Sequence, residues 1–159
     1  MGMLMGYCCE ECGFDLWRYI GTVSVDSSYT GVSGFRQVFL NSCHVGLYSD
    51  HRYPGRCLVV FDKHKDHLED LSEYELSYFM RCVTKVGEAV KKVVGAKRMN
   101  YAILGNAVSH VHAHVIPRFE TDPNPNQSPW NRHDKAGELT KERATEIIEE
   151  IREALNDGT

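Results

Sequence analysis

The stretch Ser109–Arg118, with the sequence SHVHAHVIPR, places histidines at three alternate positions: His110, His112 and His114. Successive side chains of a β-strand point to opposite faces, so a strand here would present the three imidazoles on one face, about 6.7 Å apart. The apolar residues between them would face a hydrophobic core. Such a row fits an exposed polar face, a metal site or a catalytic site that handles phosphate, because neutral imidazole both binds metals and acts as a nucleophile.

Composition restricts the classes of protein and partner. The 159 residues predict one domain with a substantial core. The formal net charge of −4 disfavours long nucleic acids and membrane surfaces as partners. No apolar run reaches the roughly 20 residues of a membrane span, and residues 1–6 lack the features of a secretory signal, so a cytoplasmic location is expected. The six cysteines are too sparse for a disulfide scaffold and are expected to be thiols.

Apolar periodicity predicts an α+β domain with a mainly antiparallel sheet, a central helix and a C-terminal helix. The clearest helix begins at the capping-box sequence SEYE, Ser72–Glu75, and ends at Gly95. The other expected elements are strands within 35–48 and at 57–61, 99–104 and 109–117, and a second helix over 140–155.

The sequence LGNAVSHVHAHVIPR, residues 104–118, resembles the signature of the histidine triad (HIT) family, in which histidines alternate with apolar residues after a turn that carries glycine and an amide. The segment YPGRCLVVFDKH, residues 53–64, is similar to the family's Pro-Gly turn and following strand. The resemblance covers about Phe39–Phe119 and is closest to a bacterial branch related to diadenosine polyphosphate hydrolases. It implies one HIT-like domain over 1–159, with a Cys-bearing extension at 1–34, the HIT core at 35–119, and a Pro-rich loop and C-terminal helix at 120–159.

The resemblance implies an enzyme that acts at the α-phosphorus of a dinucleoside polyphosphate, a nucleoside polyphosphate or a nucleoside phosphoramidate. The middle histidine, His112, would attack phosphorus, and water or a second acceptor would then cleave a nucleotidyl-histidine intermediate. His114 would hydrogen-bond the α-phosphate or the leaving group. Asn106, where the family usually has glutamine, and backbone N–H groups near Ser109 would bind phosphate. The alternatives are a nucleotide-binding regulatory module with little turnover and a zinc protein that uses the histidine row as its metal site.

Four further positions lie near this implied site. Ser49 and Asp50 are candidates for binding ribose hydroxyls, although Asp50 would equally serve as a turn residue that bonds its own backbone. Arg56 stands where the family often has histidine, and it would bind phosphate or form a structural ion pair. Trp130 would anchor the C-terminal helix or reach the active site of a partner subunit, because proteins of this family are commonly homodimers.

A structural zinc site is the second implication of the resemblance. Cys9 and Cys12 form a Cys-x-x-Cys pair, which is weak evidence by itself. In similar bacterial proteins such a pair binds zinc together with two histidines, and these match His64 and the first triad residue, His110. The four ligands would make a closed tetrahedral site, with His67 as the alternative to His64. The other reading is that the cysteines bind no metal. No catalytic metal is expected, because the remaining two triad histidines carry the chemistry.

Overall fold

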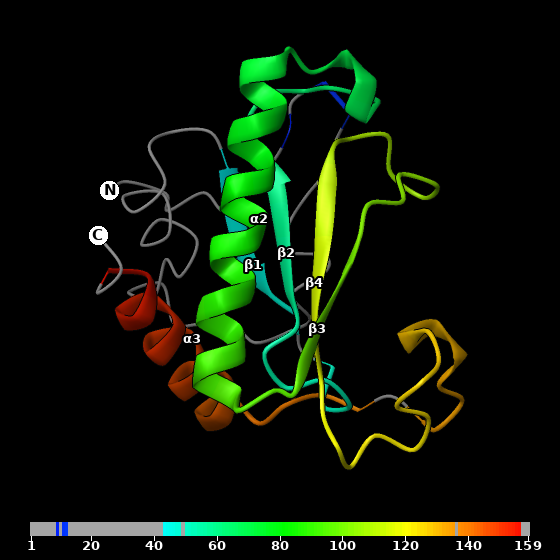
Figure 1. Ribbon diagram of the computed structural model, residues 1–159, viewed down its shortest axis with the longest axis vertical. Helices are drawn as coiled ribbons and strands as arrows, with labels where there is room; N and C mark the ends of the chain where they lie inside the picture. The colour runs from blue at the N-terminus through cyan, green and yellow to red at the C-terminus, as the bar shows by residue number, and fades with distance from the viewer. Residues whose placement is uncertain (1–8, 10, 13–42, 49, 136, 157–159) are drawn as a thin grey trace.

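A computed structural model of the chain describes residues 9, 11–12, 43–48, 50–135 and 137–156. The segment 14–33, the first part of the strand region expected at 35–48, and Ser49 lie outside the described residues. The described part confirms the predicted α+β architecture: one antiparallel sheet, a long helix against it and a C-terminal helix (Figure 1).

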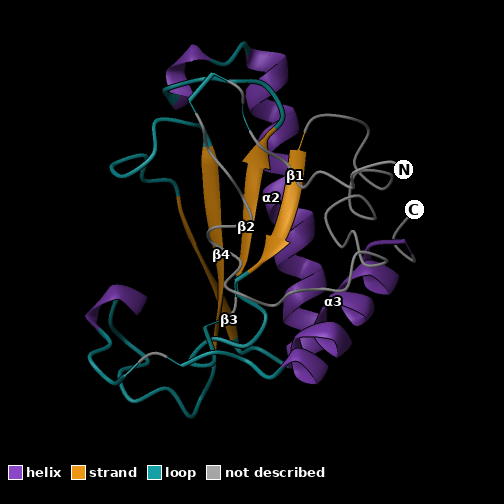
Figure 2. Ribbon diagram, turned by 180° about the vertical axis from the view of Figure 1, so that it is seen from behind, coloured by secondary structure: helices purple, strands orange, loops and turns teal. Residues whose placement is uncertain are grey.

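The sheet has four strands in the order β1-β2-β4-β3, and every neighbouring pair is antiparallel (Figure 2). The strands are β1 (Cys43–Leu47), β2 (Cys57–Phe61), β3 (Arg98–Ala102) and β4 (His112–Arg118). All five residues of β1 and of β2 are buried. β4 begins three residues later than expected, at His112, so His110 lies in the bend that leads into the strand.

The long helix α2 (Glu73–Val94) covers one face of the sheet (Figure 1). It begins as predicted, because the Ser72 hydroxyl accepts from the Glu75 N–H and the Glu75 carboxylate accepts from the Ser72 N–H. It ends at Gly95, whose left-handed backbone (φ 64°) lets the chain leave the helix. The apolar side chains of Ala113 and Val115 on β4, and of Val111 just before the strand, are buried in the core with those of the helix, as expected.

The second helix, α3 (Lys141–Asn156), packs beside α2 and adds its isoleucines to the same core (Figure 2). Two short 3₁₀ helices complete the described elements, η2 (Leu68–Asp70) and η3 (Pro129–Asn131). Neither long helix in the described part of the chain is apolar enough over its length to cross a membrane.

The register of the strands explains where the histidines lie. His112 is paired with Val60 on β2, and His114 is paired with Leu58 on one side and with Ala102 on the other. Because side chains alternate along β4, both imidazoles lie on the face away from α2. The sheet therefore separates a hydrophobic core from a face that carries ionisable groups.

Candidate active site and metal centre

The backbone fixes the imidazole of His112. Its Nδ1 atom lies 2.6 Å from the carbonyl oxygen of His110, and the residue is buried, with 8% of its surface exposed. A carbonyl oxygen can only accept a hydrogen bond, so Nδ1 carries the proton and Nε2 carries the lone pair. A ring nitrogen with a lone pair is what a nucleophilic histidine requires, and the role of His112 as a nucleophile stays a prediction.

His114 is held in the opposite tautomer. The Arg56 guanidinium nitrogen Nη2 lies 3.3 Å from its Nδ1 atom, and a guanidinium can only donate. Nδ1 of His114 is therefore the acceptor, and its proton lies on Nε2. Burial, the positive charge of Arg56 and the neighbouring His112 lower the pKa of His114 to about 4, so this imidazole is neutral near pH 7.

The two imidazoles line a pocket of about 200 Å³. Its other walls come from the residue after β1, from β2 and from the loop between β3 and β4, and they are Tyr48, Leu58, Leu104, Gly105, Asn106, Ala107 and Val108. Asn106 thus lines the same pocket as the two imidazoles, and its phosphate-binding role stays a prediction. Ser109 is exposed and is not among the lining residues, so its phosphate-binding role stays a prediction.

Aromatic and cationic side chains meet at the outer edge of this pocket. The Arg56 guanidinium carbon lies 4.2 Å from the ring centre of Tyr48 and 5.9 Å from that of Trp130. The Trp130 ring packs edge-on against His114, with 5.7 Å between ring centres. Trp130 is 47% exposed, and these contacts place it beside the site of its own chain; the roles predicted for it, anchoring the C-terminal helix or reaching a partner's site, stay predictions.

Asp50 is buried, and its carboxylate forms an ion pair with Arg52. Both of its carboxylate oxygens accept from Arg52, with a closest distance of 2.7 Å, and one oxygen also accepts the Arg52 backbone N–H. Hydrogen bonds from Arg52 and its positive charge keep the pKa of Asp50 low despite burial. These contacts match the turn-residue alternative, and Asp50 does not line the histidine pocket. Its contact with ribose stays a prediction, as does that of Ser49, which lies outside the described residues.

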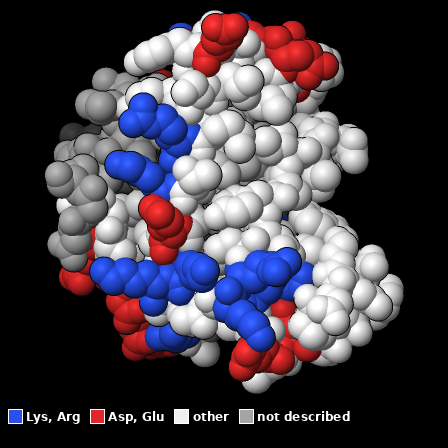
Figure 3. Space-filling view, viewed as in Figure 1, with Lys and Arg blue, Asp and Glu red and all other residues white. Residues whose placement is uncertain are grey.

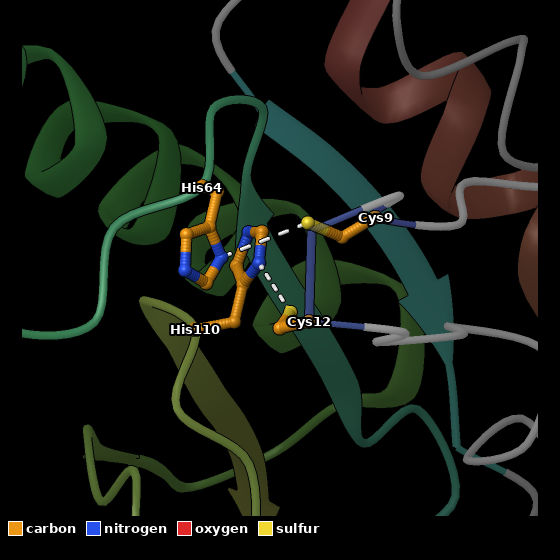
Figure 4. A group of neighbouring side chains, drawn as sticks. All are labelled: Cys9, Cys12, His64 and His110. Carbon is orange, nitrogen blue, oxygen red and sulfur yellow. Dashed lines mark hydrogen bonds between the residues drawn. The ribbon is translucent and has the colours of Figure 1, made fainter.

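A second cluster, which we call the Cys-His cluster, joins Cys9, Cys12, His64 and His110 (Figure 4). One potential ligand atom from each residue lies within 4.8 Å of the others. The Cys9 sulfur is 3.7 Å from Nδ1 of His64, and the Cys12 sulfur is 3.5 Å from Nδ1 of His110. Around a tetrahedral zinc ion, normal Zn–S and Zn–N bond lengths put sulfur and nitrogen roughly 3.6 Å apart. The donor set and its spacing therefore fit zinc.

The groups that contact the other ring nitrogen of His64 and of His110 also favour metal binding by these histidines. Nε2 of His110 donates to the Phe61 carbonyl oxygen at 2.8 Å, which leaves the lone pair on Nδ1, the atom nearest Cys12. Nε2 of His64 lies 3.4 Å from a carboxylate oxygen of Asp66. Such carbonyl and carboxylate partners orient metal-binding histidines in general. Burial lowers the pKa of His110 and so favours the neutral form that a metal requires.

A larger groove lies elsewhere. It has a volume of about 670 Å³ and is lined in part by Lys97, Arg98 and Arg118. Basic side chains also gather in the lower half of the face drawn in Figure 3. Arg118 ends β4, six residues from His112, or about 20 Å along the strand. The groove holds none of the triad histidines. Because His112 and His114, whose tautomers are fixed by hydrogen bonds, line the smaller pocket, we assign the candidate site there.

One organising residue of this region was missed by the sequence analysis. Arg118 is buried, and its guanidinium donates to Asp122, to the Asn100 side chain and to the carbonyl oxygens of Asn124 and Gln127. This network holds the Pro-rich loop that leads to Trp130. Only the proximity of an arginine to a Pro- and Asn-rich loop hinted at it in the sequence.

The antiparallel sheet, the helix behind it and the alternating histidines on its open face together define the HIT fold. The family model for the HIT domain matches residues 38–121, more than half of the chain. The chain belongs to the HIT domain family.

Proteins of similar sequence and structure support this assignment. An uncharacterized HIT-like protein of Methanocaldococcus jannaschii is 31% identical over 105 residues, which cover 64% of this chain and 75% of that protein. The asymmetrical bis(5'-nucleosyl)-tetraphosphatase of Schizosaccharomyces pombe is 33% identical over 87 residues, 52% of this chain and 48% of the yeast protein. The crystal structure of a histidine triad protein from Sinorhizobium meliloti superposes with a TM-score of 0.65 at 29% identity, covering 72% of this chain and 84% of that chain. The family thus includes a nucleotide hydrolase.

Proposed function

We propose that the chain is a nucleotide hydrolase or nucleotidyl transferase that acts at the α-phosphorus of its substrate through a nucleotidyl-histidine intermediate. The observation that carries this proposal is the hydrogen bond from Nδ1 of His112 to the His110 carbonyl oxygen at 2.6 Å, inside a pocket. It leaves the lone pair on Nε2, and it stabilises the positive charge that develops on the ring when Nε2 bonds to phosphorus.

The steps use groups that border the pocket. Nε2 of His112 forms a bond to the α-phosphorus, and the bond from phosphorus to the leaving group breaks, with its electron pair going to the departing atom. Asn106 and Nε2–H of His114 donate hydrogen bonds to phosphate oxygens. Water then attacks the phosphorus, the P–N bond breaks, its electron pair returns to Nε2, and one proton of the water passes to solvent.

The name of the Schizosaccharomyces pombe relative supports a dinucleoside polyphosphate as one candidate substrate, because that protein is called a bis(5'-nucleosyl)-tetraphosphatase. We further propose that the Cys-His cluster binds a structural zinc ion, which would join the Cys-bearing segment to the strand that carries the nucleophile. The zinc would supply no chemistry to the substrate, because His112 and His114 are not members of the cluster.

The test is intact-protein mass spectrometry after mixing the chain with diadenosine tetraphosphate and, separately, with an adenosine phosphoramidate. We expect an adenylylated chain or released adenosine monophosphate. Both should disappear in His112→Ala and persist in His133→Ala, a control that removes an exposed histidine.

The regulatory alternative gives a different result. A binding module would hold adenosine monophosphate in a calorimetric titration, yet it would form no adduct and release no product from either compound. An adduct that survives in His112→Ala would instead contradict the assignment of the nucleophile. The cytoplasmic location and the homodimer stay predictions; light scattering of the purified chain tests the dimer.

A further inference from the structure

The guanidinium of Arg56 is a buried positive charge that is only weakly paired with a carboxylate. Its side chain is 12% exposed, and its Nε atom is buried with no hydrogen-bond partner among the described residues. The nearest carboxylate, that of Asp50, is 3.6 Å away and already binds Arg52 at 2.7 Å. Burial lowers the pKa of Arg56, which reflects the unfavourable desolvation of its charge. A buried charge is stable only when it is paired, so this guanidinium can accept a further anion.

The position of Arg56 indicates which anion it would bind. It contacts His114, which lines the histidine pocket, and it also lines a second pocket of about 100 Å³. That second pocket is lined by Arg52, Tyr53, Arg56, Ile116, Pro129, Trp130 and Arg132. Two of its three arginines are tightly paired, Arg52 with Asp50 at 2.7 Å and Arg132 with Asp134 at 2.6 Å. Arg56 is therefore the least tightly paired arginine of this pocket, and we expect it to bind an anion that extends beyond the α-phosphate.

The leaving groups of the candidate substrates differ in the chemistry that they require. A polyphosphate departs as an oxyanion and needs positive charge, whereas the amine of a phosphoramidate needs a proton on its nitrogen. Nδ1 of His114 accepts a hydrogen bond from Arg56, and the adjacent positive charge opposes protonation of the ring. Arg56 thus supplies a fixed positive charge, and the neutral ring of His114 supplies a hydrogen-bond donor. Neither residue is a general acid that could protonate an amine leaving group.

We propose that Arg56 binds the anionic leaving group and makes this chain selective for nucleoside polyphosphates over nucleoside phosphoramidates. The inference rests on the proposed function, because it names the substrate class of the same site. When Nε2 of His112 bonds to the α-phosphorus, the bond between that phosphorus and the bridging oxygen breaks. The electron pair goes to the bridging oxygen of the departing polyphosphate, and the guanidinium of Arg56 neutralises the resulting charge.

The first experiment compares kcat/KM for diadenosine tetraphosphate and for an adenosine phosphoramidate in the wild-type chain, Arg56→Gln and Arg56→Lys. We expect the wild type to prefer the polyphosphate. Arg56→Gln should lower kcat/KM for the polyphosphate by roughly 100- to 1000-fold, the usual effect of losing a donor to a developing oxyanion, and should leave the phosphoramidate within about tenfold. Arg56→Lys should recover part of the polyphosphate activity, because it keeps the charge without the planar fork.

The control is Arg143→Gln, which removes an exposed arginine paired with Glu146 on α3 and should change neither value. Thermal melting of each variant reports whether it folds. Equal losses on the two substrates in a folded Arg56→Gln would overturn the proposal, as would a wild-type preference for the phosphoramidate.

A binding measurement separates failure of this inference from failure of the proposed function. Inorganic tripolyphosphate and adenosine monophosphate are titrated calorimetrically into the wild type and Arg56→Gln. Weaker binding of tripolyphosphate with little change for adenosine monophosphate supports the role of Arg56, even if the chain turns over no substrate. If the wild type and Arg56→Gln bind tripolyphosphate with the same affinity, the inference is wrong, whatever the adduct experiment on His112 shows.

Discussion

The Nδ1 atoms of His112 and His114 make opposite kinds of hydrogen bond on the same strand. In His112 this atom donates to a backbone carbonyl at 2.6 Å, and in His114 it accepts from Arg56 at 3.3 Å. We therefore predict opposite neutral tautomers for the two rings. A long-range ¹⁵N–¹H NMR spectrum near pH 7.5 should show the proton of His112 on Nδ1 and that of His114 on Nε2.

Two variants assign these signals and test their cause. His112→Ala and His114→Ala should each remove one set of ring signals. In Arg56→Gln the ring of His114 loses a cationic neighbour, so its pKa should rise while the tautomer of His112 stays the same. The same tautomer for both rings in the wild type would contradict the hydrogen-bonding geometry described above.

A second prediction concerns metal content. The Cys-His cluster includes His64 and excludes His67, whose backbone N–H instead bonds the Asp70 carboxylate at the start of η2. We expect the purified chain to carry one zinc ion by elemental analysis. The matched pair His64→Ala and His67→Ala separates the two candidates, because only the first should lose zinc.

Removal of the metal should also destabilise the fold. A ligand present at about 1000 times its Kd stabilises a protein by roughly 4 kcal/mol, and 1 kcal/mol shifts Tm by about 2–4 °C in a chain of this size. Chelation should thus lower Tm by roughly 8–16 °C in the wild type and in His67→Ala. A wild-type Tm that is insensitive to a strong chelator, in a chain that holds no zinc, would refute the metal site.

The elements and the members of the Cys-His cluster were predictable because local signals encode them. The capping box at Ser72 and the glycine at position 95 mark the ends of α2, and the alternation around His112 fixes which face of β4 is polar. The Cys-x-x-Cys pair and two spaced histidines gave the four members of the cluster, although the assignment needed the resemblance to a family.

The surroundings of Arg56 were less predictable. Its contacts with Tyr48, His114 and Trp130 join segments that are far apart in the sequence, and no local pattern specifies them. Asp50 shows the same limit. A turn aspartate two residues before an arginine suits either a ribose contact or an ion pair, and only the folded geometry shows the carboxylate bound by Arg52.

A third prediction follows from the low pKa of His114. Its pKa is about 4 in the fold, against an ordinary value of 6.5. Above pH 6.5 the ring is neutral in the folded and unfolded chains, so it contributes no pH dependence. Between pH 6.5 and 4 the unfolded chain takes up a proton that the folded chain does not, and stability therefore falls as the pH falls. Below pH 4 both states are protonated and the loss levels off.

The measurement is urea unfolding of the wild type and His114→Gln in matched buffers from pH 8 to 3.5. The difference between their free energies of unfolding should shift against the wild type only within the window from 6.5 to 4. Acid effects on other groups, the Cys-His cluster included, are common to both chains and cancel in the difference. A difference that stays constant across the window would show that the pKa of His114 is not depressed.

A fourth prediction concerns the turn that places Arg56. Gly55 has φ +94°, a conformation that residues with a side chain rarely adopt, and a Cβ atom there would lie 2.8 Å from Cγ1 of Val94 at the end of α2. Gly95 is a matched control, because its φ is also positive, at +64°, but a Cβ atom there meets nothing within 4 Å. Gly95→Ala should cost about 1–2 kcal/mol through backbone strain alone. Gly55→Ala should cost roughly 2–5 kcal/mol, because overpacking against α2 adds to the strain.

Urea unfolding of the two variants gives the comparison, and the same samples report on the site. Because Gly55 directly precedes Arg56, its replacement should also weaken tripolyphosphate binding in the fraction that remains folded, whereas Gly95→Ala should leave this affinity unchanged. Equal destabilisation by the two substitutions would mean that the Pro-Gly turn does not pack against the end of α2. Unchanged anion binding in a destabilised Gly55→Ala would mean that the turn supports the fold without positioning Arg56.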